Sequence, residues 1–150
     1  LLTRRTDHLS AHAGQIAFPG GRRDPEDASL LATAIRETRE EVGIELTPDQ
    51  LLARLPDVPA FTRTKRGNLV VTPFVFAVSD PDVKVTPNHE VDTTLWVPIS
   101  MLADEDKRSM FKLDFEGKQY DLPCIHLDPG QYRLWGMTFR MLETLLDALR

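Results

Sequence analysis

The sequence predicts an α+β domain, in which strands and helices are mixed without a regular strand–helix–strand alternation. Its 150 residues suggest one domain, spanning 1–150, and a hydrophobic content of 41% is enough for a core. A run rich in β-branched and aromatic residues at 69–78 favours a strand. Apolar residues at helical spacing from about Trp135 to Leu149 favour a helix. Because the chain begins at Leu1, inside a predicted strand, we expect a short N-terminal segment to be missing.

The other elements follow in order along the chain. Asp27 or Ser29 can cap a helix that runs to about Val42 and ends at Gly43. A short helix is expected at 100–106, and a hairpin of 110–115 with 118–127 turns at Glu116–Gly117. Further strands are expected at 1–3, 15–18, within 52–61 and at 93–99. In the last helix, the predicted core residues are Phe139, Leu142, Leu145, Leu146 and Leu149.

Composition narrows the class of protein. The net charge of −5 argues against a nucleic-acid partner and favours a small-molecule one. The single cysteine, Cys124, excludes an internal disulfide, fits the reducing cytoplasm and is expected to be a core thiol in its apolar segment. No apolar run approaches the ~20 residues that a membrane span needs.

The segment AIRETREEVGI, at 34–44, raises the first functional question. With about 100° per residue, Glu37, Glu40 and Glu41 share a helix face that borders the predicted buried stripe of Leu31, Ala34, Ile35, Thr38 and Val42. A like-charge pair four residues apart is unfavourable unless something compensates it. One explanation is a solvated face with local ion pairs. The alternative is a site for a hard cation, since Mg²⁺ prefers oxygen ligands.

A glycine-rich turn feeds the same helix. In FPGGRRDPED, at 18–27, Gly20 and Gly21 permit close backbone approach, while Arg22 and Arg23 supply positive charge. A glycine turn set beside a row of carboxylates is a plausible site for a metal ion and a diphosphate.

These motifs together resemble the box of Nudix hydrolases, G-x5-E-x7-R-E-U-x-E-E-x-G-U, where U is a bulky apolar residue. Gly21 opens the box, and Arg36–Glu37, Glu40–Glu41 and Gly43–Ile44 close it. Asp27 stands where the first Glu is expected, with eight rather than seven residues between it and Arg36, and Thr38 replaces the apolar U. The resemblance implies an α/β/α sandwich around a mixed β-sheet. It also implies Mg²⁺- or Mn²⁺-dependent hydrolysis of a nucleoside diphosphate linked to another moiety, with Glu37, Glu40 and Glu41 as metal ligands.

The upstream segment LLTRRTDHLSAHAGQIAFPGG, at 1–21, is similar to the signature of the coenzyme A pyrophosphatase branch, although Ser10 stands where an Arg is often found. The later YRLWGMTFRML, at 132–142, is similar to the C-terminal helix of that branch. This implies cleavage of coenzyme A to 4′-phosphopantetheine and adenosine 3′,5′-bisphosphate. Two alternatives stay open: another Nudix substrate, such as ADP-ribose, NADH, a dinucleotide or a nucleoside triphosphate, and a Nudix-fold binding module without activity.

The resemblance also implies roles for single residues. Glu41 or Glu90 would accept the proton of the attacking water, and Arg36 would orient Glu40. Arg5 and Lys65 are candidates for contacts to the 3′-phosphate of coenzyme A. Further substrate contacts are expected from Gln15, Phe18, Gly20 and Gly21, although Phe18 can instead pack in the core. The assembly, as a monomer or a homodimer, stays open.

Overall fold

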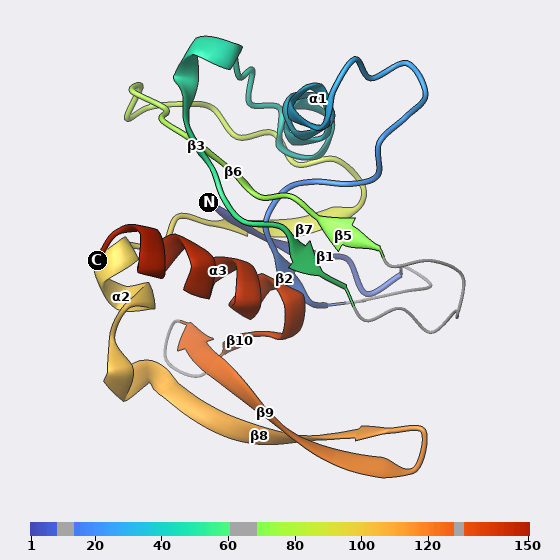
Figure 1. Ribbon diagram of the computed structural model, residues 1–150, viewed down its shortest axis with the longest axis vertical. Coiled ribbons are helices and arrows are strands. Elements are labelled where there is room, and N and C mark those ends of the chain that lie inside the picture. Colours follow the sequence, from blue (N-terminus) through green and yellow to red (C-terminus); the bar gives the residue numbers. More distant parts are fainter. Residues whose placement is uncertain (9–13, 61–68, 128–130) are drawn as a thin grey trace.

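The computed structural model describes residues 1–8, 14–60, 69–127 and 131–150 (Figure 1). Its helices are α1 at Leu30–Val42, α2 at Ile99–Leu102 and α3 at Gly136–Ala148, with 3₁₀ turns at Pro48–Gln50 and Glu105–Lys107. The strands are β1 Leu2–Arg5, β2 Ile16–Ala17, β3 Leu51–Arg54, β4 Val58–Pro59, β5 Val70–Val71, β6 Phe74–Phe76, β7 Val91–Leu95, β8 Arg108–Phe115, β9 Lys118–Leu127 and β10 Tyr132–Trp135. The α+β class is confirmed.

The strands pair in small antiparallel ladders. Strand β1 lies between β2 and β7, with Thr3 opposite Ala17 and Thr94. A second ladder has the order β10-β9-β8, and β3 pairs with β6 and β4 with β5. Every pairing within the described ranges is antiparallel, so the parallel pairs of the expected mixed sheet do not occur there.

Two hydrophobic clusters lie between three layers, which are α1, the sheet that contains β1, and α3. Figure 1 shows α1 and α3 on opposite sides of β1. Buried Leu2 of β1 packs with Leu142 and Leu146 of α3, together with Ile125 and Leu127 of β9 and other residues of that cluster. Leu1, next to it in sequence, packs instead beside Val42 of α1. This alternation along one strand gives the helix–sheet–helix order that positions α1 against β1 and β7.

Prolines divide two of the expected strands. The run at 69–78 forms β5 and β6, with Thr72–Pro73 between them, and the segment at 52–61 forms β3 and β4 around Pro56. Proline lacks the N–H that a ladder needs, so each continuous ladder ends there. The two interruptions lie side by side, since the N–H of Leu55 bonds to the carbonyl of Pro73 at 2.9 Å.

Local signals set both ends of α1. The Ser29 hydroxyl accepts the N–H of Ala32 at 3.1 Å, which satisfies a free amide of the first turn. Gly43 has a left-handed φ of 71° and ends the helix. Of the predicted stripe, Val42 is buried and the rest are half-buried. Thr33 and Glu41 are buried as well, which the stripe did not predict.

The C-terminal helix confirms most of its predicted core. Phe139, Leu142 and Leu146 are buried, and Leu145 packs against the same cluster. Leu149 is 60% exposed and lies beyond the last residue of α3, so its predicted burial is wrong. Cys124 is fully buried, as expected of a core thiol. Within the described chain, the helices are too short or too polar to cross a bilayer.

Candidate active site

Glu41 is a buried carboxylate tied to the glycine loop. It lies in the last turn of α1, is 7% exposed, and accepts the N–H of Gly20 at 3.0 Å. Burial raises the pKa of the Glu41 carboxyl, and the hydrogen bond from Gly20 partly opposes this shift. Gly20 lies outside any helix or strand, in the loop between β2 and α1, with a φ of 154°. The loop therefore faces the acidic helix with its backbone, as the glycine pair predicts.

Gly21 leaves the space that the Glu37 carboxylate fills. A Cβ on Gly21 would lie 2.4 Å from the carboxyl carbon of Glu37 and 2.5 Å or less from both its oxygens. Glu37 is largely buried, which raises its pKa, while the neighbouring Arg36 lowers it. The close approach of loop and helix thus depends on the absence of a side chain at position 21.

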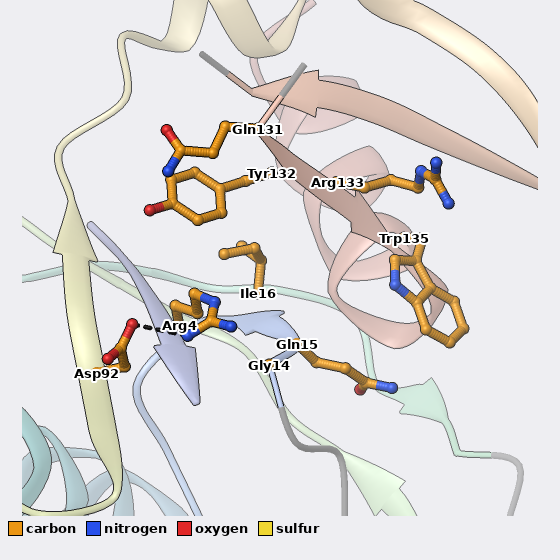
Figure 2. Close-up of a pocket in the computed structure, with 9 residues that line it drawn as sticks. All are labelled: Arg4, Gly14, Gln15, Ile16, Asp92, Gln131, Tyr132, Arg133 and Trp135. Atoms are coloured by element: carbon orange, nitrogen blue, oxygen red, sulfur yellow. Dashed lines mark hydrogen bonds and ion pairs between the residues drawn. The ribbon is translucent and has the colours of Figure 1, made fainter. Parts of the chain in front are cut away.

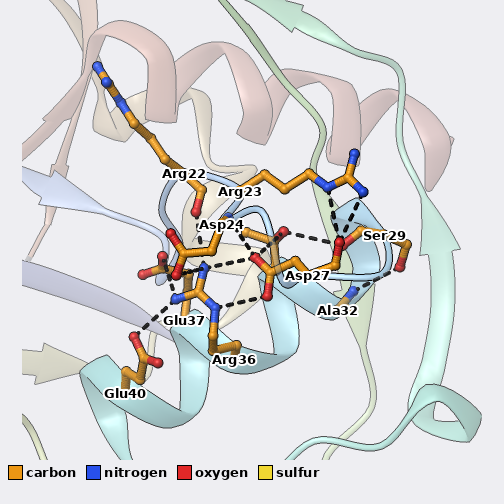
Figure 3. Close-up of polar contacts among 10 residues, drawn as sticks. Arg22, Arg23, Asp24, Asp27, Ser29, Ala32, Arg36, Glu37 and Glu40 are labelled. Atoms are coloured by element: carbon orange, nitrogen blue, oxygen red, sulfur yellow. Dashed lines mark hydrogen bonds and ion pairs between the residues drawn. The ribbon is translucent and has the colours of Figure 1, made fainter.

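Arg36 donates hydrogen bonds to three acids of this region and lies 3.5 Å from a fourth, Asp24 (Figure 3). Its Nη1 donates to Glu37 Oε1 at 3.0 Å and to Glu40 Oε2 at 3.1 Å. Its Nε and Nη2 donate to the two carboxylate oxygens of Asp27 at 3.0 and 2.9 Å, and Nη2 also to the carbonyl of Arg22 at 3.0 Å. With all these donors engaged, Arg36 is suited to orienting Glu37 and Glu40.

Asp27 anchors that arginine. It is 8% exposed, and its Oδ2 also accepts the Thr33 hydroxyl at 2.8 Å and the Asp24 N–H at 2.9 Å. The guanidinium of Arg36 holds the pKa of the Asp27 carboxyl far below its usual range. The sequence left the role of this departure from the box open. In the structure, Asp27, although one methylene shorter than the Glu of the box, reaches Arg36 and makes a bidentate pair with it.

Arg5 brings Glu41 and Glu90 together. Its Nη1 lies 3.9 Å from Glu41 Oε1, and its Nη2 lies 3.5 Å from Glu90 Oε2. Its Nε is buried and has no hydrogen-bond partner among the described residues. Arg5, a candidate contact to the 3′-phosphate, lies between two of the predicted site carboxylates. No local sequence pattern predicts this contact, since it joins β1, the end of α1 and a loop.

Backbone contacts fix the loop that carries Glu90. The N–H of Thr86 bonds to the carbonyl of Val42 at 2.8 Å, and the N–H of Asn88 to the carbonyl of Glu41 at 2.9 Å. On the other side, the N–H of Thr6 bonds to the carbonyl of Glu90 at 2.9 Å. The last carbonyls of a helix have no partner within it, so this loop both satisfies α1 and holds Glu90 near it.

The remaining predicted site residues lie elsewhere. Gln15 lines a cavity of about 610 Å³ with Arg4, Tyr132 and Trp135 (Figure 2), and the lining includes none of the three helical glutamates. Phe18 packs against the core cluster of Leu2 and α3. Lys65 lies outside the described residues. The structure therefore brings together Arg5, Gly20, Gly21, Arg36, Glu37, Glu40, Glu41 and Glu90. The backbone carbonyl of Gln15 accepts the N–H of Arg5 at 3.0 Å, but no contact joins Phe18 to this set among the described residues.

The donor chemistry of this cluster suits a hard divalent cation. Glu41 interacts electrostatically with both Glu37 and Glu90, and each contact raises its pKa further. Such mutual repulsion is what a cation with oxygen ligands relieves. Over the described ranges, however, no three or more acidic, His or Cys side chains form a group that could hold a metal ion in the arrangement that the structure shows. Arg5 and Arg36 supply the compensating charge here, so a bound cation would share these carboxylates with them.

Comparison with known proteins identifies the family. The NUDIX domain model matches residues 1–115. A protein named uncharacterized Nudix hydrolase NudL from Yersinia pestis is 58% identical over 149 residues, covering 99% of this chain and 71% of the relative. A protein of the same name from Photorhabdus laumondii is 34% identical over 151 residues, covering 100% and 76%. Nudix hydrolase 3 of Caenorhabditis elegans is 32% identical over 165 residues, covering 99% and 66%.

A solved structure has the same fold. The crystal structure of a MutT/nudix family protein from Enterococcus faecalis matches with a TM-score of 0.63 at 15% identity. The match covers 99% of this chain and 54% of that one, so this chain spans about half of its length. Fold, box residues and relatives agree: the chain belongs to the Nudix family and is a Nudix pyrophosphohydrolase.

Proposed function

We propose that this enzyme hydrolyses coenzyme A, or a derivative of it, between its two phosphates, with Mg²⁺ or Mn²⁺ as cofactor. The products are 4′-phosphopantetheine and adenosine 3′,5′-bisphosphate. The observation that carries the diphosphate chemistry is the contact of the Gly20 N–H with buried Glu41, beside Arg5 and Glu90. This contact brings the glycine pair of the loop, a row of carboxylates and the guanidinium of Arg5 to one place.

Three glutamates would hold the metal. Glu37, Glu40 and Glu41 are the proposed ligands, and Arg36 orients the first two through its bonds of 3.0 and 3.1 Å. When bound, a divalent cation neutralises phosphate charge and lowers the pKa of water. Gly20 and Gly21 leave room for a phosphate chain to approach the backbone, where N–H groups can bind it.

The attacking water must give up a proton to a carboxylate oxygen of Glu41 or Glu90. The geometry favours Glu41 in one respect, because its carboxylate is held against the glycine loop by the N–H of Gly20 at 3.0 Å. Exposure favours Glu90, whose side chain is 39% exposed and can be reached from solvent. Arg5 contacts both groups, so it can hold either carboxylate in place while the other moves.

The substrate assignment rests on the segment at 1–21, which lies outside most of the box and resembles the coenzyme A branch. Arg5 and Lys65 are the proposed contacts to the 3′-phosphate, and for Arg5 the proposal is supported by its positive charge, which lies 3.9 Å from Glu41 and 3.5 Å from Glu90 at the site. A cytoplasmic location is also part of the proposal, supported by the lone, buried Cys124. The acidic net charge supports a small-molecule substrate over nucleic acid.

A substrate panel tests the proposal. We would incubate the protein with Mg²⁺ or Mn²⁺ and coenzyme A, 3′-dephospho-coenzyme A, ADP-ribose, NADH, a dinucleotide or a nucleoside triphosphate, and identify products by mass. Coenzyme A should be the best substrate, with kcat/KM about ten- to a hundredfold above the dephospho form, since a charge-assisted contact is worth about 1.5–3 kcal/mol. Equal values would remove the 3′-phosphate site. Faster turnover of ADP-ribose or NADH would overturn the coenzyme A assignment.

A further inference from the structure

The β8–β9 hairpin has a long outer edge. In the ladder β10-β9-β8, strand β8 is the outermost strand, and its eight residues run without proline and without a break in register against β9. Figure 1 shows the hairpin extending away from the rest of the molecule. No strand within the described ranges pairs with the outer side of β8. Such an edge offers free backbone N–H and C=O groups to a strand of another chain.

The turn determines which backbone groups face outward. Glu116 and Gly117 have φ values of 51° and 75°, as in the two-residue turn that favours hairpins, and they join the pair Phe115–Lys118. Residues flanking such a turn exchange hydrogen bonds, and hydrogen-bonded pairs alternate along an antiparallel ladder. The outward backbone groups therefore belong to Met110, Lys112 and Asp114, which are all exposed.

The edge is complementary to itself in one register. If two copies of β8 pair antiparallel about Leu113, Lys112 of each copy lies opposite Asp114 of the other. On the opposite face, Leu113 meets its own copy and Phe111 meets Phe115, which is 39% exposed in one chain. Opposite charges and apolar pairs placed directly across a ladder both stabilise it.

The neighbouring registers are less favourable. Centring the pair on Lys112 sets this lysine against its own copy, and like charges directly opposite are destabilising. Centring the pair on Phe111 sets Lys112 against Met110 and Asp114 against Arg108. In that register, Arg108 can reach Asp114 only by giving up its hydrogen bond of 2.8 Å to Glu143. A lysine on an exposed edge usually blocks pairing. Here Asp114, two residues later, allows pairing with a copy of the same strand.

We infer that β8 is a dimerisation edge, at which two copies of this chain join their β10-β9-β8 ladders into one continuous sheet. The symmetric pair would place the two copies of Leu113 side by side and so extend the hairpin face on which Leu113 lies opposite the 43% exposed Tyr120 within each chain. The partner is a second copy and not another strand. In an antiparallel pair, Lys112 and Asp114 of one copy lie opposite Asp114 and Lys112 of the other, so each charge meets its opposite.

Single cysteines test the register in the full-length protein. At the centre of the pair, the two Leu113 Cα atoms would lie about 4.5 Å apart, within the range for a disulfide. Leu113→Cys should therefore give a covalent dimer on mild oxidation. The matched variants Lys112→Cys and Phe111→Cys should not, because their copies are displaced by about two and four residues along the strand, at about 3.4 Å per residue. The wild type controls for buried Cys124.

Charge reversal tests the contact itself. Lys112→Asp and Asp114→Lys should each weaken the dimer at least about tenfold, since symmetry reverses two cross-strand pairs at once. A mixture of the two variants should restore it as a heterodimer, seen by sedimentation and native mass spectrometry. Circular dichroism checks folding, because Lys112 also faces Asp121 inside the hairpin. A wild type that stays monomeric at about 100 μM, a mixture that fails to associate, or equal crosslinking at all three cysteines would overturn the inference.

Discussion

Gly21→Ala should separate the activity of this enzyme from its stability. The added methyl group would lie 2.4 Å from the Glu37 carboxyl carbon, whereas Cβ atoms essentially never come closer than 3.0 Å to another heavy atom. Something must therefore move. The atoms that it meets are the end of a flexible side chain and not backbone, so the carboxylate can swing aside at little cost in folding free energy.

The cost should appear in turnover instead. Restoring ordinary contact requires a displacement of Glu37 on the order of 1 Å, and a misplacement of that size can lower a rate about a hundredfold, or about 2.7 kcal/mol in activation free energy. We would measure kcat with the best substrate of the panel at saturating metal, and the melting temperature by circular dichroism. We expect kcat to fall about a hundredfold while the melting temperature changes by only a few degrees.

A double-mutant cycle supplies the control. If Gly21 acts through Glu37, then Gly21→Ala should cost little more in a Glu37→Gln background, and the two effects should not add. Additive losses would mean that the loop itself, and not the position of Glu37, limits the reaction. Unchanged turnover in Gly21→Ala would refute the view that this carboxylate must stay where the structure has it.

Three further changes test the neighbouring acids. Glu40→Gln should lower kcat at least about a hundredfold through loss of metal-ion catalysis while the fold survives, and near-normal turnover at saturating metal would contradict its assignment as a ligand. Asp27→Asn should lower activity about ten- to a hundredfold by freeing Arg36. Because the pKa of Asp27 is depressed when folded, its stabilising effect is present above the unfolded pKa of 3.8 and is lost as pH falls, so the melting-temperature gap to wild type should narrow in acid. Glu41→Gln should abolish most turnover, yet in a chelator at pH 7 the variant should melt at a higher temperature than the wild type. Burial raises the pKa of Glu41 above 4.5, so its charge destabilises the folded state above that pH. A difference in melting temperature that does not close below pH 4.5 would argue against this cause.

Signals that lie within a few residues of each other could be read from the sequence. The cap at Ser29, the stop at Gly43 and the turn at Glu116–Gly117 are local features, and the structure confirms all three. The interruption at Pro73 was equally local, since proline cannot donate to a ladder, but the β-branched run around it favoured one continuous strand.

Contacts between distant segments could not be read in the same way. The position of Arg5 between Glu41 and Glu90 depends on the register of β1 against β7 and on the burial of the last turn of α1. Helical periodicity predicted that Glu41 borders the buried stripe. It could not predict that the loop from residue 86 onward would pack against the last turn of α1 and bury this carboxylate. The bidentate Asp27–Arg36 pair likewise needs the turn geometry that only the folded loop supplies.

The loop that begins at Thr86 has a consequence for how such sequences can diverge. Its hold on α1 runs through the backbone N–H groups of Thr86 and Asn88, so almost any residue except proline can make these bonds. What must be preserved is the count of residues from Thr86 to Glu90, since one insertion there would turn the carboxylate away from Glu41. Selection on this segment should therefore reject changes in length more strongly than substitutions at Thr86, whereas Asn88 is also constrained because its side chain accepts the N–H of Glu90 at 2.9 Å.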